Sequence, residues 1–337
     1  LLIGEKLTGK IGRIELGMLE VVTQDSDVAP GRNFVVGRVK YAFRRQSYIG
    51  AIFTNGEPTG TTKNTVAGAD FSIATTNFFG SRKNFDFSAY GLKSYTPGVH
   101  SRDMAYGAQV RYPNDRIYLS LSWQDIGANF DPKLGYVQRK GVRTTVFSSR
   151  YSPRPRGHKY IRQISFGFDL TDYESTIYRT VESRSLSFIP LGVLFHGGQQ
   201  FSYTIERDTE QLFRPFTIHP GVTIPVNRYD YTRHALAFSG PTNRPLTYRS
   251  SYNRGSFYTG SSDELTGAIN WRKSAHLTAG VEMRQYWVRL KQGDFNTSLL
   301  LVRFNYFFTP RLSVTNFVQY DTDSQNIGLQ SRLRWIL

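Results

Sequence analysis

The segment IGLQSRLRWIL, from Ile327 to Leu337, alternates residue by residue between two kinds of side chain. The first set is Ile327, Leu329, Ser331, Leu333, Trp335 and Leu337, and the second is Gly328, Gln330, Arg332, Arg334 and Ile336. Successive side chains of a β-strand point to opposite faces of its sheet. The segment therefore predicts a strand with one apolar face and one face that carries cations and an amide.

The same two-residue period recurs along the chain. It is clearest in Val35–Arg44, Arg116–Gln124, Ile164–Leu170, Leu265–Arg272 and Leu300–Tyr306. The longest repeats run about nine to eleven residues, the length with which a tilted strand crosses a bilayer. A large soluble β-sandwich or propeller is the alternative, but so many long charged strands would need an equally long solvated face. The pattern favours a transmembrane barrel.

Composition agrees with this interpretation. The 337 residues contain no linker-like segment, so we predict a single domain over residues 1–337. Mean hydropathy is −0.40, and the absence of an apolar run of about 18 residues excludes transmembrane helices. The 21 tyrosines and 24 phenylalanines suit aromatic girdles at the two membrane interfaces. The absence of cysteine is compatible with an oxidising periplasmic route.

The connections between the predicted strands alternate between short and long. Long ones include Gly127–Gly141, Asp208–Tyr229 and Thr259–Glu264. Barrels that run up and down across the outer membrane have short periplasmic turns and long outer loops. We therefore predict an all-β, transmembrane, up-and-down antiparallel β-barrel of about 19 strands in the outer membrane of a Gram-negative bacterium. Because bacterial barrels have even strand numbers, the complete protein is expected to have roughly 20–22 strands.

Several strings carry a resemblance to a known family. They are KLTGKIG (Lys6–Gly12), APGRNF (Ala29–Phe34), GAIFTN (Gly50–Asn55), NFDPKLGYVQRK (Asn129–Lys140), YSPRP (Tyr151–Pro155), FRPFTIHPGVTIP (Phe213–Pro225) and RLRWIL (Arg332–Leu337). Together they resemble the C-terminal outer-membrane β-barrel region of a bacterial family of unknown function. Its members carry an N-terminal domain similar to family-9 carbohydrate-binding modules.

This resemblance covers essentially the whole chain and implies the fold, but it brings no established activity. It implies that the N-terminal carbohydrate-binding-like domain and some flanking strands are not part of this sequence. We expect one strand before Leu1 and two after Leu337. Since a barrel reaches the outer membrane with a signal peptide, we also expect this to be a mature or trimmed sequence.

The formal net charge is +16, and many basic residues fall on positions predicted to face the lumen. The lumen-lining candidates are Arg38, Lys40, Arg249, Arg272, Arg284, Arg303, Arg332 and Arg334. One interpretation is a positive lumen that favours anionic solutes, because low-dielectric walls focus the field. Another is a set of ladders in which arginines pair with Asp86, Asp169, Glu206 and Glu282 to pack a wide barrel. A third places some basic residues at the rim, against lipid phosphates.

Two long loops, Asp208–Tyr229 and Gly127–Gly141, are more apolar than a solvated loop would be. We predict that they fold inward or pack against the rim as a plug or constriction. The candidate residues are Phe213, Phe216 and His219 in the first loop and Phe130 and Tyr136 in the second.

No motif for catalysis or metal binding is present. The six histidines form no HExxH pattern and the serines no GxSxG elbow, so we predict no catalytic residue, metal site or cofactor. Dispersed basic residues argue against nucleic acid as a partner. We expect a porin-like conduit for small anionic or glycan-derived solutes, or a plugged barrel that anchors a glycan-binding domain or partner subunits. The expected surroundings are outer-membrane lipid and lipopolysaccharide, with glycans or other envelope proteins as further partners.

Overall fold

Antiparallel β-strands make up nearly all of the regular structure in a computed structural model that describes residues 1–25, 30–58 and 63–336. Ala29 of the APGRNF string and the terminal Leu337 lie outside the described residues. The strands of the first half are β1 (Ile3–Ile11), β2 (Ile14–Val22), β3 (Asn33–Arg44), β4 (Ser47–Asn55), β5 (Thr65–Thr75), β6 (Phe85–Tyr95), β7 (Met104–Pro113), β8 (Ile117–Ile126), β9 (Val142–Tyr151) and β10 (Ile161–Ser175).

The strands of the second half include two short ones that lie inside the predicted loop Asp208–Tyr229. They are β11 (Thr180–Phe195), β12 (Gln200–Gln211), β13 (Phe216–His219), β14 (Val222–Ile224), β15 (Arg228–Ser239), β16 (Leu246–Phe257), β17 (Gly260–Arg272), β18 (Leu277–Leu290), β19 (Gly293–Phe307), β20 (Leu312–Asp321) and β21 (Asn326–Trp335). A single 3-10 turn, η1 (Phe78–Gly80), is the one helical element among the described residues. No helix in that part of the chain is long and apolar enough to cross a membrane.

Nineteen of these strands belong to one sheet, and β13 and β14 form a separate hairpin. The all-β, antiparallel prediction is therefore confirmed, and the size of the sheet equals the predicted number of strands. From β1 to β8 each strand pairs with the next strand in the chain. β12 pairs with β15, because β13 and β14 form the separate hairpin, and from β15 to β21 each strand again pairs with the next. The sheet is not closed, because no pairing joins β1 to β21 among the described residues.

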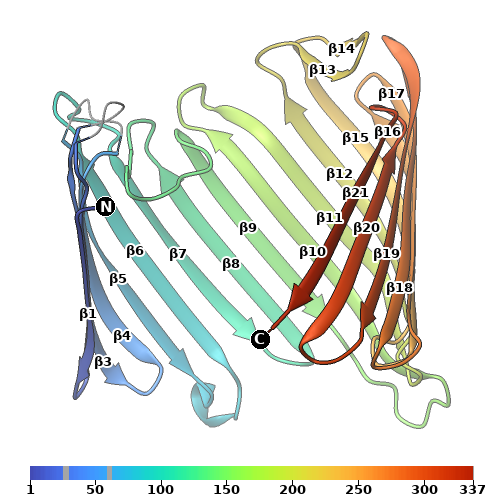
Figure 1. Ribbon diagram of the computed structural model, residues 1–337, viewed down its shortest axis with the longest axis horizontal. Helices are drawn as coiled ribbons and strands as arrows, with labels where there is room; N and C mark the ends of the chain where they lie inside the picture. Colours follow the sequence, from blue (N-terminus) through green and yellow to red (C-terminus); the bar gives the residue numbers. More distant parts are fainter. Residues whose placement is uncertain (26–29, 59–62, 337) are drawn as a thin grey trace. The chain divides into compact units, whose positions relative to one another are not determined.

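The chain divides into two compact units. The first consists of Leu1–Ser149 and Leu170–Arg184, and the second of Arg150–Asp169 and Ser185–Leu337. In the first unit, β3 to β8 lie side by side in chain order (Figure 1). The prediction of one domain stays a prediction.

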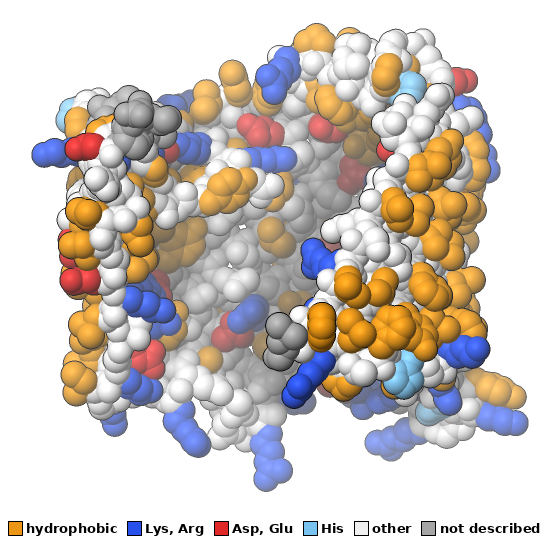
Figure 2. Space-filling model, viewed as in Figure 1, with side chains coloured by type: hydrophobic (Ala, Val, Ile, Leu, Met, Phe, Trp, Pro, Cys, Tyr) orange, Lys and Arg blue, Asp and Glu red, His pale blue; other side chains and the backbone are white. Residues whose placement is uncertain are grey.

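The sheet has two faces of opposite character in both units. On the apolar face, large side chains are left uncovered: Leu121 of β8 is 43% exposed and Phe304 of β19 is 47% exposed. Figure 2 shows such hydrophobic side chains gathered over the strands near the C-terminus of the second unit. We call the other face the polar face. It carries charged side chains such as Arg38 of β3, Glu282 of β18 and Arg303 of β19. Alternation thus places apolar groups on a surface with no described protein layer over it.

Buried apolar residues gather beneath two loops instead of between two layers. In the first unit Val66, Ala105 and Phe130 form one cluster. In the second unit a larger cluster joins the β13–β14 hairpin to the ends of neighbouring strands. Its buried members are Val222, Ile224, Tyr229, Val288 and Leu290.

One predicted loop is wrong in extent. The polar segment Thr259–Glu264 was expected to be a long connection, but β17 already begins at Gly260 and leaves a two-residue turn after Phe257. Ser261, Ser262 and Asp263 belong to the ladder, where they pair with Ser256, Gly255 and Arg254 of β16. Asp263 also accepts a hydrogen bond from the Tyr252 hydroxyl at 2.7 Å.

Candidate functional site: the polar face of the sheet

Two ion pairs on the polar face reach across an intervening strand that places a small residue between the partners. Arg249 of β16 and Glu282 of β18 are both register partners of Ala268 on β17. Because Ala268 has only a methyl group, the Arg249 guanidinium passes over it and its Nη2 donates to Glu282 Oε2 at 2.7 Å. Arg284 donates to the other oxygen of Glu282, from Nη2 to Oε1 at 2.8 Å. One buried carboxylate therefore serves two of the predicted lumen arginines.

The first unit repeats this arrangement with a glycine. Arg38 of β3 pairs with Asp70 of β5, and their closest atoms, Nη1 and Oδ1, are 2.6 Å apart. Gly50 lies between them on β4, where a Cβ would approach both Arg38 Nη2 and Asp70 Oδ1 to 2.8 Å. A side chain at position 50 would therefore break the pair. Lys40 lies with its Nζ 4.7 Å from the centre of the Tyr48 ring.

The remaining predicted lumen arginines differ from these. Within residues 1–25, 30–58 and 63–336, Arg272, Arg303, Arg332 and Arg334 have no carboxylate partner. Arg272 and Arg332 lie on one row of cross-strand neighbours from β17 to β21, and Arg303 is two residues away from that row on β19. The Arg303 guanidinium lies 5.5 Å from the centre of the Phe317 ring.

Three of them, Arg272, Arg303 and Arg332, border two hollows of about 190 and 390 Å³, and Arg303 lines both. The other polar groups that line the hollows are a further cation, Arg244, and neutral amides and hydroxyls such as Asn305, which donates to the Thr278 hydroxyl at 3.1 Å. A face with several cations, neutral hydrogen-bonding groups and no neighbouring carboxylate attracts anions. We call Arg272, Arg303 and Arg332 the arginine cluster.

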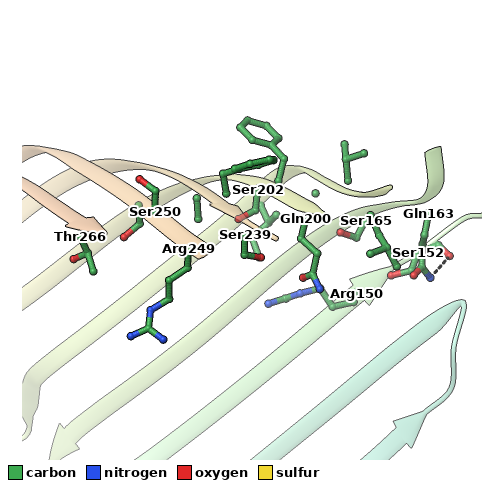
Figure 3. A pocket seen from close by; sticks show the side chains of 18 residues that line it. Arg150, Ser152, Gln163, Ser165, Gln200, Ser202, Ser239, Arg249, Ser250 and Thr266 are labelled. Carbon is green, nitrogen blue, oxygen red and sulfur yellow. Dashed lines mark hydrogen bonds between the residues drawn. The ribbon is translucent and has the colours of Figure 1, made fainter. Parts of the chain in front are cut away.

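Another hollow of about 600 Å³ in the second unit is lined by hydroxyl and amide side chains together with apolar ones such as Leu194 and Phe201 (Figure 3). The labelled neutral residues are Ser152, Gln163, Ser165, Gln200, Ser202, Ser239, Ser250 and Thr266. The two arginines in this view are compensated, since Arg150 Nη2 lies 2.6 Å from Asp169 Oδ2 and Arg249 pairs with Glu282. This part of the polar face is therefore a neutral, hydrogen-bonding wall, in contrast with the arginine cluster.

The loop of the second unit covers one end of the polar face. Its β13–β14 hairpin packs Val222 and Ile224 against Val288 and Leu290 of β18, which share the face of Glu282. His219 stacks on Phe295 of β19, with ring centres 4.5 Å apart. The predicted Phe213 and Phe216 are 45% and 44% exposed, so they are not part of this contact core.

Buried polar contacts accompany this hairpin. In the turn between β16 and β17, the Tyr258 hydroxyl donates to Glu210 Oε2 at 2.7 Å. Burial and this carboxylate raise the pKa of Tyr258 above its ordinary value. The hydroxyl therefore stays protonated and keeps donating at physiological pH.

The loop Gly127–Gly141 of the first unit packs in the same way. Phe130 is 2% exposed and contacts Val66 and Ala105, whereas Tyr136 is 86% exposed. Gly141 ends the loop with φ +69°, and a Cβ there would lie 2.7 Å from Ile177 Cδ1. Only glycine combines that backbone conformation with that close approach.

Charged residues fix the same loop. Burial alone would raise the pKa of Asp131, but the ammonium groups of Lys140 and Lys133 hydrogen-bond to it and hold the pKa below its ordinary value. Two buried residues that sequence reasoning missed, Asn64 and Ser94, also hold the loop. A single asparagine just before a strand, or a single serine near the end of one, gives no sequence signal of this role.

The described residues contain no group of three or more His, Asp or Glu that would hold a metal ion. Two of the histidines serve local structure: His158 Nδ1 accepts from the backbone N–H of Ile161 at 2.9 Å, and the His234 ring shares a hydrogen bond with the Tyr203 hydroxyl at 2.7 Å. No protein-family model matches the chain, and no curated protein matches it. The family resemblance stays a prediction.

Proposed function

We propose that this chain is the transmembrane part of an outer-membrane β-barrel that conducts small anionic solutes. The observation that carries the proposal is the arginine cluster, which lies on the polar face without a carboxylate partner among the described residues. On a closed barrel this face would line the lumen. Uncompensated arginines there would raise the local concentration of anions and lower that of cations.

The uncovered apolar face supports the membrane location. Large apolar side chains at alternate positions are about 40–50% exposed in the middle of strands in both units. Contiguous apolar surface of this extent would aggregate in water, whereas a bilayer would cover it. Strands of 9 to 16 residues in the sheet are long enough for this role.

Planar bilayers test the conduit. Purified protein is expected to give stable current steps, and in a potassium chloride gradient the reversal potential should indicate preference for chloride. This preference should weaken as salt rises and shortens the Debye length. Cation preference would contradict the proposal.

A second function, a plugged membrane anchor, is favoured by the two loops that pack on the polar face. Replacing Phe213–Val226 with a two-residue Asn-Gly turn removes the hairpin but keeps the backbone hydrogen bond from Leu212 to Asn227. For a conduit, this variant should conduct more than the native protein. Silence of the native protein together with current in the variant would favour the plugged anchor.

A further inference from the structure

A cavity of about 530 Å³ lies in the first unit, between the loop Gly127–Gly141 and the polar face. Its floor comes from one register row of the sheet, where Ile52, Leu92, Ala105 and Ile126 are cross-strand neighbours interrupted only by Gly68. A few positions away the same face carries charged residues such as Lys40, Asp70 and Asp86. The apolar residues of this row lie beneath the loop. A cavity of this size falls in the range of small-molecule sites.

The roof of the cavity is held in place from below. The side chain of Asn64, which is 2% exposed, donates from Nδ2 to the Asp131 carbonyl at 2.8 Å and accepts from the Lys133 N–H at 3.2 Å. The buried Ser94 hydroxyl accepts from the Asp131 N–H at 3.1 Å. Since three backbone groups of the loop are bound to buried side chains, the cavity is formed before any ligand arrives.

One polar atom in the cavity wall lacks a partner. Thr144 of β9 lines the cavity and is 4% exposed, and its hydroxyl forms no hydrogen bond to any described residue. A buried hydroxyl without a partner is unfavourable, and native structures rarely keep one without a reason. An occupant with a hydroxyl or carbonyl group would satisfy it.

The rest of the lining indicates the shape and charge of that occupant. Tyr90, Phe130, Tyr136 and Tyr173 supply aromatic surface, which favours a flat ring. Arg139 also lines the cavity, and its guanidinium lies 4.5 Å from the centre of the Tyr173 ring. The nearest carboxylate, of Glu182, is 4.0 Å from Arg139 Nη1, so the cation is only weakly compensated.

We propose that this cavity binds a ring-containing amphipathic small molecule whose hydroxyl group pairs with Thr144 and whose anionic group faces Arg139. The site is independent of the conduit, because all its residues belong to the first unit and none belongs to the arginine cluster. A plugged barrel would hold the same site.

Two fluorescent probes test it, 6-hydroxynaphthalene-2-sulfonate and naphthalene-2-sulfonate, which differ by one hydroxyl. Their binding to the full chain in detergent is measured by equilibrium dialysis against a detergent-only blank. We expect saturable binding, with the hydroxylated probe bound about fivefold more tightly because of one additional hydrogen bond. Thr144→Val should abolish that difference. The control Thr145→Val changes the next residue of β9, whose side chain lies on the opposite face of the sheet, and should keep the difference.

Further readouts separate a ligand site from a structural role. Thr144→Val should leave the ligand-free protein at least as stable, since it removes a buried hydroxyl without a partner. Arg139→Gln should weaken both sulfonates to the same degree. Absence of saturable binding, an unchanged probe difference in Thr144→Val, or unchanged affinity in Arg139→Gln would each overturn the proposal.

Discussion

The two units of the chain share one alternating pattern, and both hold arginines on the polar face that pair with carboxylates, but the second unit also holds the arginine cluster. In the first unit, Arg38 pairs with Asp70 and Arg111 pairs with Asp86 at 2.6 Å. In the second unit, the arginine cluster has no carboxylate partner among the described residues. The difference teaches that binary patterning determines which face a residue occupies, whereas cross-strand register determines whether its charge is compensated.

The largest expected effect tests the feature that the two units share. Leu121→Arg in the first unit and Phe304→Arg in the second should each lower the free energy of unfolding in lipid vesicles by about 2–4 kcal/mol, because the charge would face the hydrocarbon. Urea titration monitored by tryptophan fluorescence measures this. Ser122→Arg and Gln330→Arg, on the polar face, are the matched controls and should be tolerated. Equal losses on both faces would refute the membrane location.

The next effect concerns the shared carboxylate of the second unit. Glu282→Gln should lower the free energy of unfolding by about 1–2 kcal/mol, since Arg249 and Arg284 both lose their charged acceptor but remain partly solvated. The same titration serves here. Glu15→Gln, which breaks an exposed pair with Lys10 in the first unit, should cause no measurable change.

Ion selectivity should distinguish the units directly. Neutralising the arginine cluster with Arg272→Gln, Arg303→Gln and Arg332→Gln should lower the chloride-to-potassium permeability ratio by at least about twofold, because uncompensated charges set the field of the lumen. Reversal potentials in a salt gradient measure the ratio. The double variant Arg38→Gln/Asp70→Asn removes a compensated pair without a net change of charge, so its ratio should stay native. A fall in this control as large as in the triple variant would contradict the comparison.

The smallest effect is pH-dependent and belongs to the loop Gly127–Gly141. Its contacts hold the pKa of Asp131 below the ordinary 3.8, so the folded state favours the ionised carboxylate. The resulting stabilisation is fully present above the ordinary pKa and is lost as pH falls through the lowered pKa. Hydrogen exchange of the loop, corrected for intrinsic rates, should therefore accelerate only below about pH 4. In Asp131→Asn the corrected rates should be independent of pH over that window.

The sequence was sufficient to predict the strands and their faces, because a period of two is a local property. It placed Leu121 and Phe304 on one face and Arg38 and Arg303 on the other without any knowledge of pairing. It failed at Thr259–Glu264, where a polar composition resembles a loop. That segment continues the ladder because Asp263 finds Tyr252 and Arg289 as partners.

Pairing of lumen arginines with Asp86, Asp169, Glu206 and Glu282 was one of the interpretations of the sequence, but the arginine that each carboxylate would meet could not be predicted. Glu282 and Arg249 are 33 positions apart, and their contact depends on the register of two strand pairs and on the small Ala268 between them. The cavity depends on Asn64 and Ser94, which reach the loop from positions far away in the chain. Such contacts between distant segments leave no trace in composition or spacing.

The outermost strands have a consequence for work with the isolated chain. Every residue of β1 and of β21 is exposed, and each strand has a described partner, β2 and β20, along one side. A strand with a bare row of N–H and C=O groups is a template on which a strand of another molecule can add. Self-association through these edges should therefore rise with protein concentration, and an N-methylated peptide copying β20, able to pair on one side only, should suppress it by capping β21.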